Sequence, residues 1–208
     1  MKTIALTQRL SACRDYAETR DALDIQWARM FSRLGFMPLV LPTAYDFKVY
    51  FSRLKVDGIL LSGGNHLSVF SKDPLSKMRD QFEMKLLDFA VKKRIPVFGI
   101  CHGMQMLSYY FGSTFRAVPD HVGVKHALRV CGESRWVGEL KKLHRVNSFH
   151  SFALDRPGRN LLVAARSVDG VPEAVEHQTL RIFGQMWHPE RGRVFREAEL
   201  NLIRLFFK

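Results

Sequence analysis

The amino-acid sequence predicts an α/β protein in which helices cover a parallel sheet. Short apolar runs alternate with amphipathic stretches along the first half of the chain, as in folds where strands and helices follow one another. The hydrophobic fraction of 47% and the charged fraction of 25% are those of an ordinary globular protein. Because the 208 residues show no repeat and no break in composition, we expect a single domain over residues 1–208.

The first half of the chain divides into strands and helices in a regular order. Strands are expected at residues 3–6, 36–41, 58–61 and 95–100, and helices at residues 22–34 and 76–93. The first helix places five apolar side chains on one face: Leu23, Trp27, Met30, Phe31 and Leu34. Gly35 then supplies a helix end. The second helix has an apolar stripe of Met78, Phe82, Leu86 and Phe89.

The second half of the chain changes character. Short strands are expected at residues 125–130, 162–166, 173–176 and 181–186, separated by Pro-Gly and Asp-Gly turns. A closing helix is expected over residues 197–207.

The chain is strongly basic, with 32 Lys and Arg against 20 Asp and Glu and a formal net charge of +12. This balance fits either a solvated basic surface or an anionic partner such as nucleic acid, an acidic membrane surface or a phosphorylated small molecule. No basic motif interleaved with aromatic residues points to RNA. The charge alone therefore leaves the partner open.

Cysteine usage and the N-terminus bear on cofactors and location. Cys13, Cys101 and Cys131 fit neither a disulfide framework nor a C-x-x-C site, and the eight histidines show no metal-ligand spacing. We therefore expect no metal and no organic cofactor. No signal peptide and no run of roughly 20 apolar residues is visible. A cytoplasmic protein without a membrane partner is the expectation.

The segment Gly99-Ile100-Cys101-His102-Gly103 carries the first chemical signal. A buried strand runs into G-x-C-x-G and then into an apolar helix, the pattern of a nucleophile elbow with Cys in the place of Ser. A sharp strand-to-helix turn strains the nucleophile's backbone, and neighbours without a β-carbon relieve the crowding. A helix N-terminus also favours the thiolate. The alternative is a small buried Cys in a glycine-bearing turn.

A second signal lies far along the chain, where a strand ends in Trp187-His188-Pro189-Glu190. A cysteine hydrolase needs a base beside the sulfur and an acceptor that holds this base in the right tautomer. His188 and Glu190 fit these two roles. A lone histidine at a strand end is more often structural, so Cys101 is what makes His188 a candidate.

These motifs, together with Ser62-Gly63-Gly64-Asn65 at the end of a strand, resemble the class I glutamine amidotransferase-like superfamily. The closer resemblance is to its γ-glutamyl hydrolase branch, the peptidase C26-like enzymes, and it covers nearly the whole chain in the family's order. The resemblance implies a flavodoxin-like three-layer sandwich with a mostly parallel central sheet and a small antiparallel β extension. It also implies a hydrolase that cleaves a γ-glutamyl amide.

Carried over to matching positions, the resemblance implies that Cys101 is the nucleophile, His188 the base and then the acid, and Glu190 the orienting carboxylate. The backbone N–H groups of Gly64 and His102 would form the oxyanion hole. Substrate contacts are implied for Gly63, Asn65, Arg79, Gln105, Asn147, Ser148, Phe149 and His150. Alternatives stay open, since Asn65 and Ser148 could cap turns and Arg79 could form a solvated helix pair with Asp80. Position 102 is His where these hydrolases most often carry Arg.

The resemblance also narrows the substrate. The segments Thr7-Gln8-Arg9 and Val146-Asn147-Ser148-Phe149-His150 look most like those of hydrolases whose substrate joins glutamate to cytidine diphosphate through a phosphoramidate nitrogen, in capsule biosynthesis. The basic balance suits such an anionic leaving group. The enzyme alternatives are a hydrolase of γ-glutamyl-γ-aminobutyrate in polyamine breakdown and a glutaminase subunit that depends on a separate synthase. A nucleic-acid-binding protein would leave both motifs unexplained, and we expect a monomer or homodimer without nucleic acid.

Overall fold

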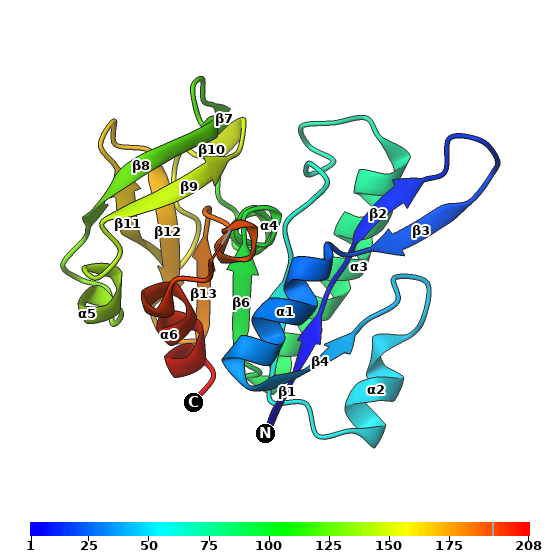
Figure 1. Cartoon of the computed structure of the whole chain (residues 1–208). Helices are drawn as coiled ribbons and strands as arrows, with labels where there is room; N and C mark the ends of the chain where they lie inside the picture. Colours follow the sequence, from blue (N-terminus) through cyan, green and yellow to red (C-terminus); the bar gives the residue numbers. More distant parts are fainter. Residues whose placement is uncertain (193) are drawn as a thin grey trace.

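The computed structural model describes residues 1–192 and 194–208 and is built around one large sheet (Figure 1). Five parallel strands are β4 (Phe36–Val40), β1 (Lys2–Leu6), β5 (Gly58–Leu61), β6 (Val97–Ile100) and β13 (Ile182–Gln185). Four antiparallel strands continue the sheet: β12 (Pro172–His177), β11 (Leu161–Ser167), β8 (Val122–Val130) and β9 (Arg145–Phe149). The strand order is β4-β1-β5-β6-β13-β12-β11-β8-β9.

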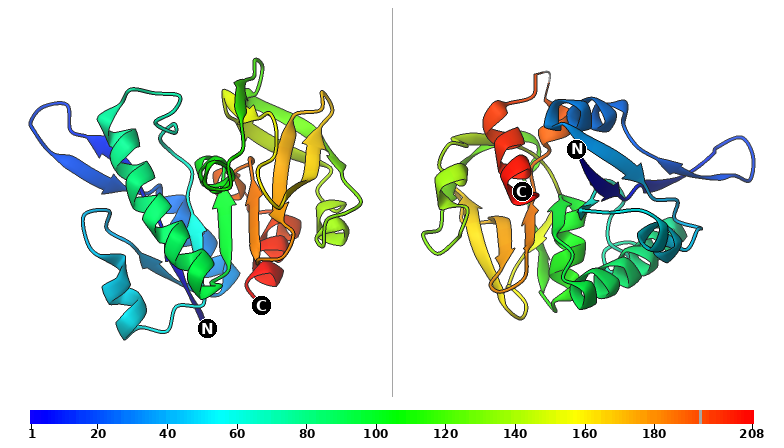
Figure 2. Two further views of the ribbon diagram at one scale, coloured as in Figure 1. Left: turned by 180° about the vertical axis from the view of Figure 1, so that it is seen from behind. Right: turned by 90° about the horizontal axis from the view of Figure 1, so that it is seen from below.

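Helices cover both faces of the parallel half. Helices α1 (Ile25–Leu34) and α6 (Glu197–Phe206) contact each other on one face, and α3 (Pro74–Lys93) and α4 (His102–Tyr110) contact each other on the other face (Figures 1 and 2). The short helices are α2 (Phe47–Arg53), α5 (Val137–Leu140) and the 3₁₀ turn η1 (Pro189–Arg191). This arrangement confirms the predicted three-layer α/β fold. Within the described part of the chain, no helix is long and apolar enough to cross a membrane.

Helix α1 shows both a confirmed prediction and a wrong boundary. Four of the five predicted apolar side chains are buried, and Gly35 ends the helix at φ 72°, in the left-handed region that favours glycine. The helix starts at residue 25 rather than 22, because the Asp24 side chain accepts a hydrogen bond from the Gln26 N–H and caps it. The residues before it form a hairpin of β2 (Arg9–Ala12) and β3 (Thr19–Ala22) that the sequence analysis missed.

Helix α3 confirms most of the predicted stripe, since Phe82 and Leu86 are buried and Phe89 packs against the core, but the buried face also includes charged residues. The helix starts two residues earlier than expected, with Asp73 as N-cap and Pro74 in the first turn. Met78 is 47% exposed, whereas Arg79 and Glu83 are fully buried. The face turned toward the sheet is therefore partly charged, because Arg79 and Glu83 bond residues that follow β5 and β6.

The predicted strands of the second half all exist, but they belong to a larger assembly than expected. β8, β11, β12 and β13 correspond to the four predicted segments; β8, β11 and β12 form, with β9, an antiparallel extension that continues the main sheet, and β13 pairs parallel with β6. The sequence analysis missed β9 and the small pair of β7 (Phe115–Ala117) and β10 (Phe152–Leu154).

The parallel half of the sheet brings distant segments together. β5, β6 and β13 are neighbours, and Ile100 pairs with Gln185 while Gly99 pairs with Leu61. Because the strands are parallel, the residues that follow them meet at one edge of the sheet. Residues 62–65, 101–105 and 186–190 therefore converge there.

Candidate active site

Cys101 occupies a strained turn between β6 and α4. Its backbone angles are φ 52° and ψ −104°, a conformation that non-glycine residues rarely adopt, and its N–H donates to the Gln185 carbonyl oxygen over 2.7 Å. A β-carbon on Gly103 would lie 2.2 Å from the Leu61 carbonyl oxygen, and one on Gly99 would lie 2.5 Å from the Gly103 backbone. Only glycine fits at both positions, so the G-x-C-x-G pattern is a packing requirement of this elbow.

His188 and Glu190 form a buried pair beside Cys101. The His188 Nδ1 atom lies 2.6 Å from the Glu190 Oε1 atom, and both side chains are almost fully buried. His188 Nε2 has no hydrogen-bond partner within residues 1–192 and 194–208. Burial of the ring by itself lowers the pKa of His188, but the adjacent Cys101 and Glu190 outweigh burial and raise this pKa to about 9. The arrangement favours the imidazolium form of His188 beside Cys101.

Asn147 fixes His188 through the backbone. The Asn147 Nδ2 atom donates to the His188 carbonyl oxygen over 2.8 Å, and the Asn147 Oδ1 atom accepts from the His188 N–H over 2.7 Å. Both ends of the amide are therefore used within the protein. Asn147 is therefore a positioning group for His188, and the expectation that it contacts substrate stays a prediction.

Gly63 and Gly64 leave room for the catalytic side chains. A β-carbon on Gly63 would lie 2.7 Å from the His188 Cε1 atom, and one on Gly64 would lie 2.5 Å from the Arg9 Cβ atom. Gly64 also has φ 140°, which favours glycine. His102 is the first residue of α4, where a backbone N–H has no acceptor within the helix. These two backbone positions, predicted as the oxyanion hole, flank Cys101 in the pocket that it lines.

Arg79 is a buried structural residue rather than a substrate contact. Its guanidinium group donates to the carbonyl oxygens of Ser62 and Gly63 over 2.7 and 3.1 Å and to the Glu83 Oε1 atom over 3.0 Å. Its side chain is fully buried, so it faces neither substrate nor solvent. Both interpretations of Arg79 from the sequence, a substrate contact and a solvated helix pair, are therefore wrong. The residue fixes the Gly63-Gly64 turn from behind.

Glu83, which the sequence analysis did not single out, connects Arg79 to the elbow. The Thr7 hydroxyl donates to the Glu83 Oε1 atom over 2.7 Å, and the His102 Nε2 atom lies 3.0 Å from Glu83 Oε2. Burial by itself raises the pKa of Glu83, but Arg79 and His102 outweigh burial and lower it to about 2. The spacing of Arg79 and Glu83, four residues apart on one helix, is the signal that could have identified this pair.

The His102 ring takes part in the same network. Its Nδ1 atom lies 2.7 Å from the Asn65 carbonyl oxygen, which can only accept a hydrogen bond. The ionised Glu83 carboxylate opposite Nε2 is also only an acceptor. Both nitrogens of the His102 ring therefore face acceptors.

The remaining predicted substrate residues divide into two groups. Asn65 bonds both backbone groups of Leu10 at 2.9 Å, and the buried Ser148 hydroxyl donates to the His121 carbonyl oxygen over 2.6 Å, so both hold the surrounding backbone. Gln105, Phe149 and His150, and also Asn65, line the pocket into which Cys101 opens, although the Gln105 amide already donates to the Phe152 carbonyl oxygen. The pocket wall is therefore formed by the start of α4 and the end of β9.

A second hollow, of about 130 Å³, meets the Cys101 pocket at Gly64. Arg9, Gly63, Glu190 and Arg191 are among the residues that line it. The Arg191 guanidinium carbon also lies 4.7 Å from the centroid of the exposed Phe149 ring. Two arginines thus stand beside the catalytic groups, on the side of Gly64 away from the Gln105 wall. Three larger hollows, of about 280, 670 and 690 Å³, do not include any residue of the triad.

This fold, with a cysteine elbow on one strand and a His–Glu pair after the neighbouring strand, defines the class of glutamine amidotransferase-like hydrolases. The family model described as Peptidase C26 matches residues 3–190. The chain therefore belongs to the peptidase C26 family, which confirms the predicted family and the prediction that the protein is an enzyme.

Individual relatives agree with this assignment. The gamma-glutamyl-CDP-amidate hydrolase of Campylobacter jejuni is 36% identical over 205 residues, which are 97% of this chain and 94% of that protein. A putative glutamine amidotransferase-like protein of Lactococcus lactis is 28% identical over 184 residues, 77% of each chain. The crystal structure of a glutamine amidotransferase from Thermotoga maritima shares the fold, with a TM-score of 0.66 and 16% identity over 96% of this chain and 81% of its own.

Proposed function

We propose that this protein hydrolyses a γ-glutamyl amide whose leaving group is a nucleoside diphosphate, and that its substrate is γ-glutamyl-CDP-amidate. The broader activity, γ-glutamyl amide hydrolysis, rests on the peptidase C26 family and on the relative from Campylobacter jejuni. The observation that carries the finer proposal is the hollow with Arg9 and Arg191, which lies beside the catalytic groups. Arginine is well suited to bind phosphate oxygens because its donors form a planar fork.

The proposed reaction begins at Cys101. Its thiolate attacks the γ-carbonyl carbon of the substrate, and the developing oxyanion accepts hydrogen bonds from the backbone N–H groups of Gly64 and His102. The His188 imidazolium, whose pKa is raised to about 9, donates its proton to the leaving nitrogen as the carbon–nitrogen bond breaks. Glu190 keeps the other ring nitrogen protonated and oriented. A γ-glutamyl thioester on Cys101 remains.

Hydrolysis of the thioester completes the cycle. His188, now neutral, takes a proton from water, and the resulting hydroxide attacks the thioester carbonyl. The carbon–sulfur bond breaks, glutamate leaves, and the thiolate–imidazolium pair is restored. In this arrangement the glutamyl group occupies the pocket walled by Gln105 and the Phe149–Ser151 segment, and the leaving group lies across Gly64. The Arg9 and Arg191 guanidinium groups then face the leaving group's phosphates.

The test is glutamate release by the purified protein from three substrates at equal concentration: γ-glutamyl-CDP-amidate, γ-glutamyl-γ-aminobutyrate and free glutamine. Preference for the nucleotide supports the proposal, whereas preference for the γ-aminobutyrate amide contradicts it in favour of polyamine breakdown. Absence of glutamate release from all three substrates contradicts the proposal in favour of a glutaminase that needs a separate synthase. Cys101→Ala is expected to abolish release while Cys131→Ala, at a partly buried cysteine outside the site, is expected to retain it. Retained turnover in Cys101→Ala contradicts the cysteine mechanism.

A further inference from the structure

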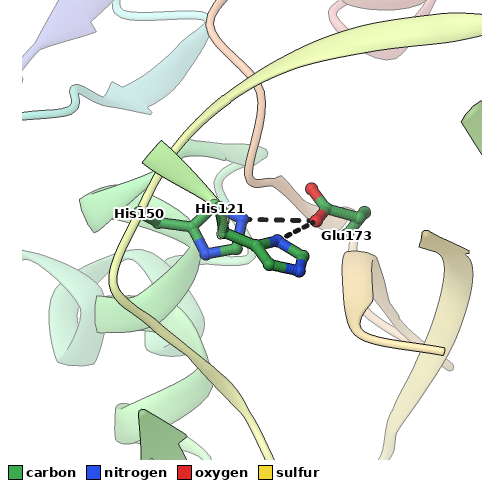
Figure 3. A group of neighbouring side chains, drawn as sticks. All are labelled: His121, His150 and Glu173. Carbon is green, nitrogen blue, oxygen red and sulfur yellow. Dashed lines mark hydrogen bonds and ion pairs between the residues drawn. The ribbon is translucent and has the colours of Figure 1, made fainter. Parts of the chain in front are cut away.

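A buried cluster of His121, His150 and Glu173 lies outside the catalytic triad (Figure 3). The three side chains come from the segments before β8, after β9 and at the start of β12, and they are exposed by only 1%, 3% and 0%. One nitrogen or oxygen from each lies within 4.8 Å of the others. None of the three has a role in the acyl transfer described above.

Among the residues that the structure describes, the His121 ring has one satisfied nitrogen and one nitrogen without a hydrogen-bond donor or acceptor that suits it. Its Nε2 atom lies 2.9 Å from the Asp169 Oδ2 atom, and since a carboxylate only accepts, Nε2 carries the proton. In a neutral ring Nδ1 then carries a lone pair, and this atom lies 3.4 Å from the Glu173 Oε1 atom. Two acceptors that face each other repel. Either a second proton on the ring or a cation between the two atoms removes this repulsion.

Other buried polar atoms in the cluster, and one on the neighbouring His126, lack hydrogen-bond partners as well. Within the two described ranges of the chain, Glu173 Oε2, His150 Nδ1 and His126 Nε2 make no hydrogen bond. The His126 ring packs against the His121 ring with 4.2 Å between centroids. Buried polar groups are nearly always satisfied, because an unpaired one costs about 1–3 kcal/mol. So many unpaired atoms in one place point to a missing ligand.

We propose that His121, His150 and Glu173 bind a Zn²⁺ ion. The Glu173 Oε1 atom lies 3.2 Å from His150 Nε2 and 3.4 Å from His121 Nδ1. Ligands about 2.1 Å from a tetrahedral zinc ion stand about 3.4 Å apart, so two edges of the tetrahedron are already present. Two imidazoles and one carboxylate are typical zinc ligands, and the fourth position is left for water.

Asp169 supplies a further feature of metal sites. Histidines that bind metals usually donate their second ring N–H to a carboxylate, which fixes the ring and its tautomer. The His121–Asp169 contact has this geometry. The ion would join the segments at His121 and His150 to β12, and the second of these segments forms the wall of the Cys101 pocket. The site is therefore a positioning device for that wall, separate from the chemistry at the sulfur.

The experiment is calorimetric titration of Zn²⁺ into the full, chelator-treated chain carrying Cys101→Ala, which removes the competing thiolate. One Zn²⁺ per chain is expected. In that background His121→Phe, which keeps the ring shape, and Glu173→Gln are each expected to weaken binding more than about a hundredfold. His144→Gln, at an exposed histidine outside the cluster, is the matched control and is expected to leave the affinity unchanged.

Two results would overturn the proposal. One is absence of Zn²⁺ binding by the Cys101→Ala chain at micromolar metal, which would leave a second proton on His121 as the explanation. The other is equal affinity in the Glu173→Gln chain. If His121→Phe fails to fold, Asp169→Asn replaces it, since the Asp169 side chain is 58% exposed; binding about 10- to 100-fold weaker is expected there, and unchanged binding counts against the site.

Discussion

At the scale of single residues, the protonation of His188 depends on its neighbours. The ring is buried, yet Cys101 and Glu190 keep its pKa near 9. The imidazolium therefore persists at neutral pH, and it is the form that can protonate a leaving nitrogen. Above pH 9 this form disappears.

Glu190→Gln is expected to lower kcat by about a hundred- to ten-thousandfold, because a neutral amide no longer holds the imidazolium. Since Glu190 raises the pKa of His188, its loss should also move the alkaline limb of the kcat/KM profile from about pH 9 to lower pH. The measurement is the pH profile of the variant and of Glu133→Gln, an exposed control. An unchanged alkaline limb in Glu190→Gln would show that this carboxylate does not set the ionisation.

Arg9 and Arg191 separate leaving-group recognition from chemistry. Arg9→Gln and Arg191→Gln should each raise KM for γ-glutamyl-CDP-amidate by about tenfold or more, since a charge-assisted contact to phosphate is lost. Hydrolysis of a γ-glutamyl anilide, whose leaving group has no charge, should change little. Arg53→Gln, on the exposed end of α2, is the control. Equal losses of activity on both substrates would mean that the two arginines act on folding or on catalysis in general and do not recognise the leaving group.

The sequence made the proposed nucleophile and base recognisable because each lies in a short local pattern. Gly99 and Gly103 mark the elbow around Cys101, and the strand that ends at His188 places the ring at the same edge. The functions of Arg79 and Asn147 were not predictable in this way. Both side chains turn toward backbone groups of segments distant in the sequence, and only the packing of those segments decides this orientation.

At the scale of elements, α3 stabilises the active-site edge with a buried ion pair. Arg79 and Glu83 lie one helical turn apart and have no exposed surface. The pair supports the Gly63-Gly64 turn on one side and His102 on the other. Removing one partner leaves the other charge buried without compensation, which typically costs about 3–5 kcal/mol.

Glu83→Gln is therefore expected to lower the free energy of unfolding by about 3–5 kcal/mol at neutral pH. Because the pKa of Glu83 is lowered from 4.5 to about 2, its stabilisation is fully present above pH 4.5 and is lost as the pH falls through about 2. The difference between wild type and variant should shrink across that window in urea unfolding curves. Asp88→Asn, in the exposed pair with Lys92, should change stability by less than about 1 kcal/mol. A constant difference down to pH 2 would contradict the assigned ionisation.

The close approach of α4 to β5 at the elbow leads to a second prediction, about stability. Gly103→Ala places a β-carbon 2.2 Å from the Leu61 carbonyl oxygen and should lower the free energy of unfolding by about 1–3 kcal/mol or more. Gly138→Ala, in α5, meets nothing within 4 Å and should raise stability by up to about 1 kcal/mol. Thermal unfolding of the two variants compares the same substitution with opposite expected signs. Similar shifts would remove the packing explanation of the motif.

The hairpin that the sequence analysis missed has a physical cause. In β2 and β3 only Leu10 is buried, so this hairpin carries almost no hydrophobic pattern. The buried strands β1, β5 and β6, in contrast, are short apolar runs that were predicted within two residues of their ends. Apolar burial thus made β1, β5 and β6 predictable and left the hairpin without a signal.

At the scale of the whole molecule, the net charge of +12 predicts that kcat/KM for an anionic substrate depends on salt. A basic surface attracts an anionic substrate, and salt screens that attraction. Increasing NaCl from about 0.05 M to about 0.5 M should lower kcat/KM for γ-glutamyl-CDP-amidate several-fold and leave the uncharged anilide unaffected. Stopped-flow or steady-state rates across the salt series provide the measurement. A flat response with the nucleotide would mean that the surface charge serves another partner.

The overall topology was predictable only in its parallel half. The sequence indicated short strands after residue 120, but their union with the parallel strands depends on long-range pairing that no local pattern reveals. The single domain, the cytoplasmic location and the monomeric or homodimeric state stay predictions.

Strand β13 makes the catalytic pair a product of late folding. It lies between β6 and β12, parallel to one and antiparallel to the other, and His188 follows it directly. A nascent or refolding chain can form α1 and α3 first, but its thiol has no base until residues 182–185 insert beside β6. Pairings between such distant segments form slowly because the chain must close a long loop. Activity should therefore return only after the helices, so the enzyme acquires its reactive sulfur when the rest of the sheet is already in place.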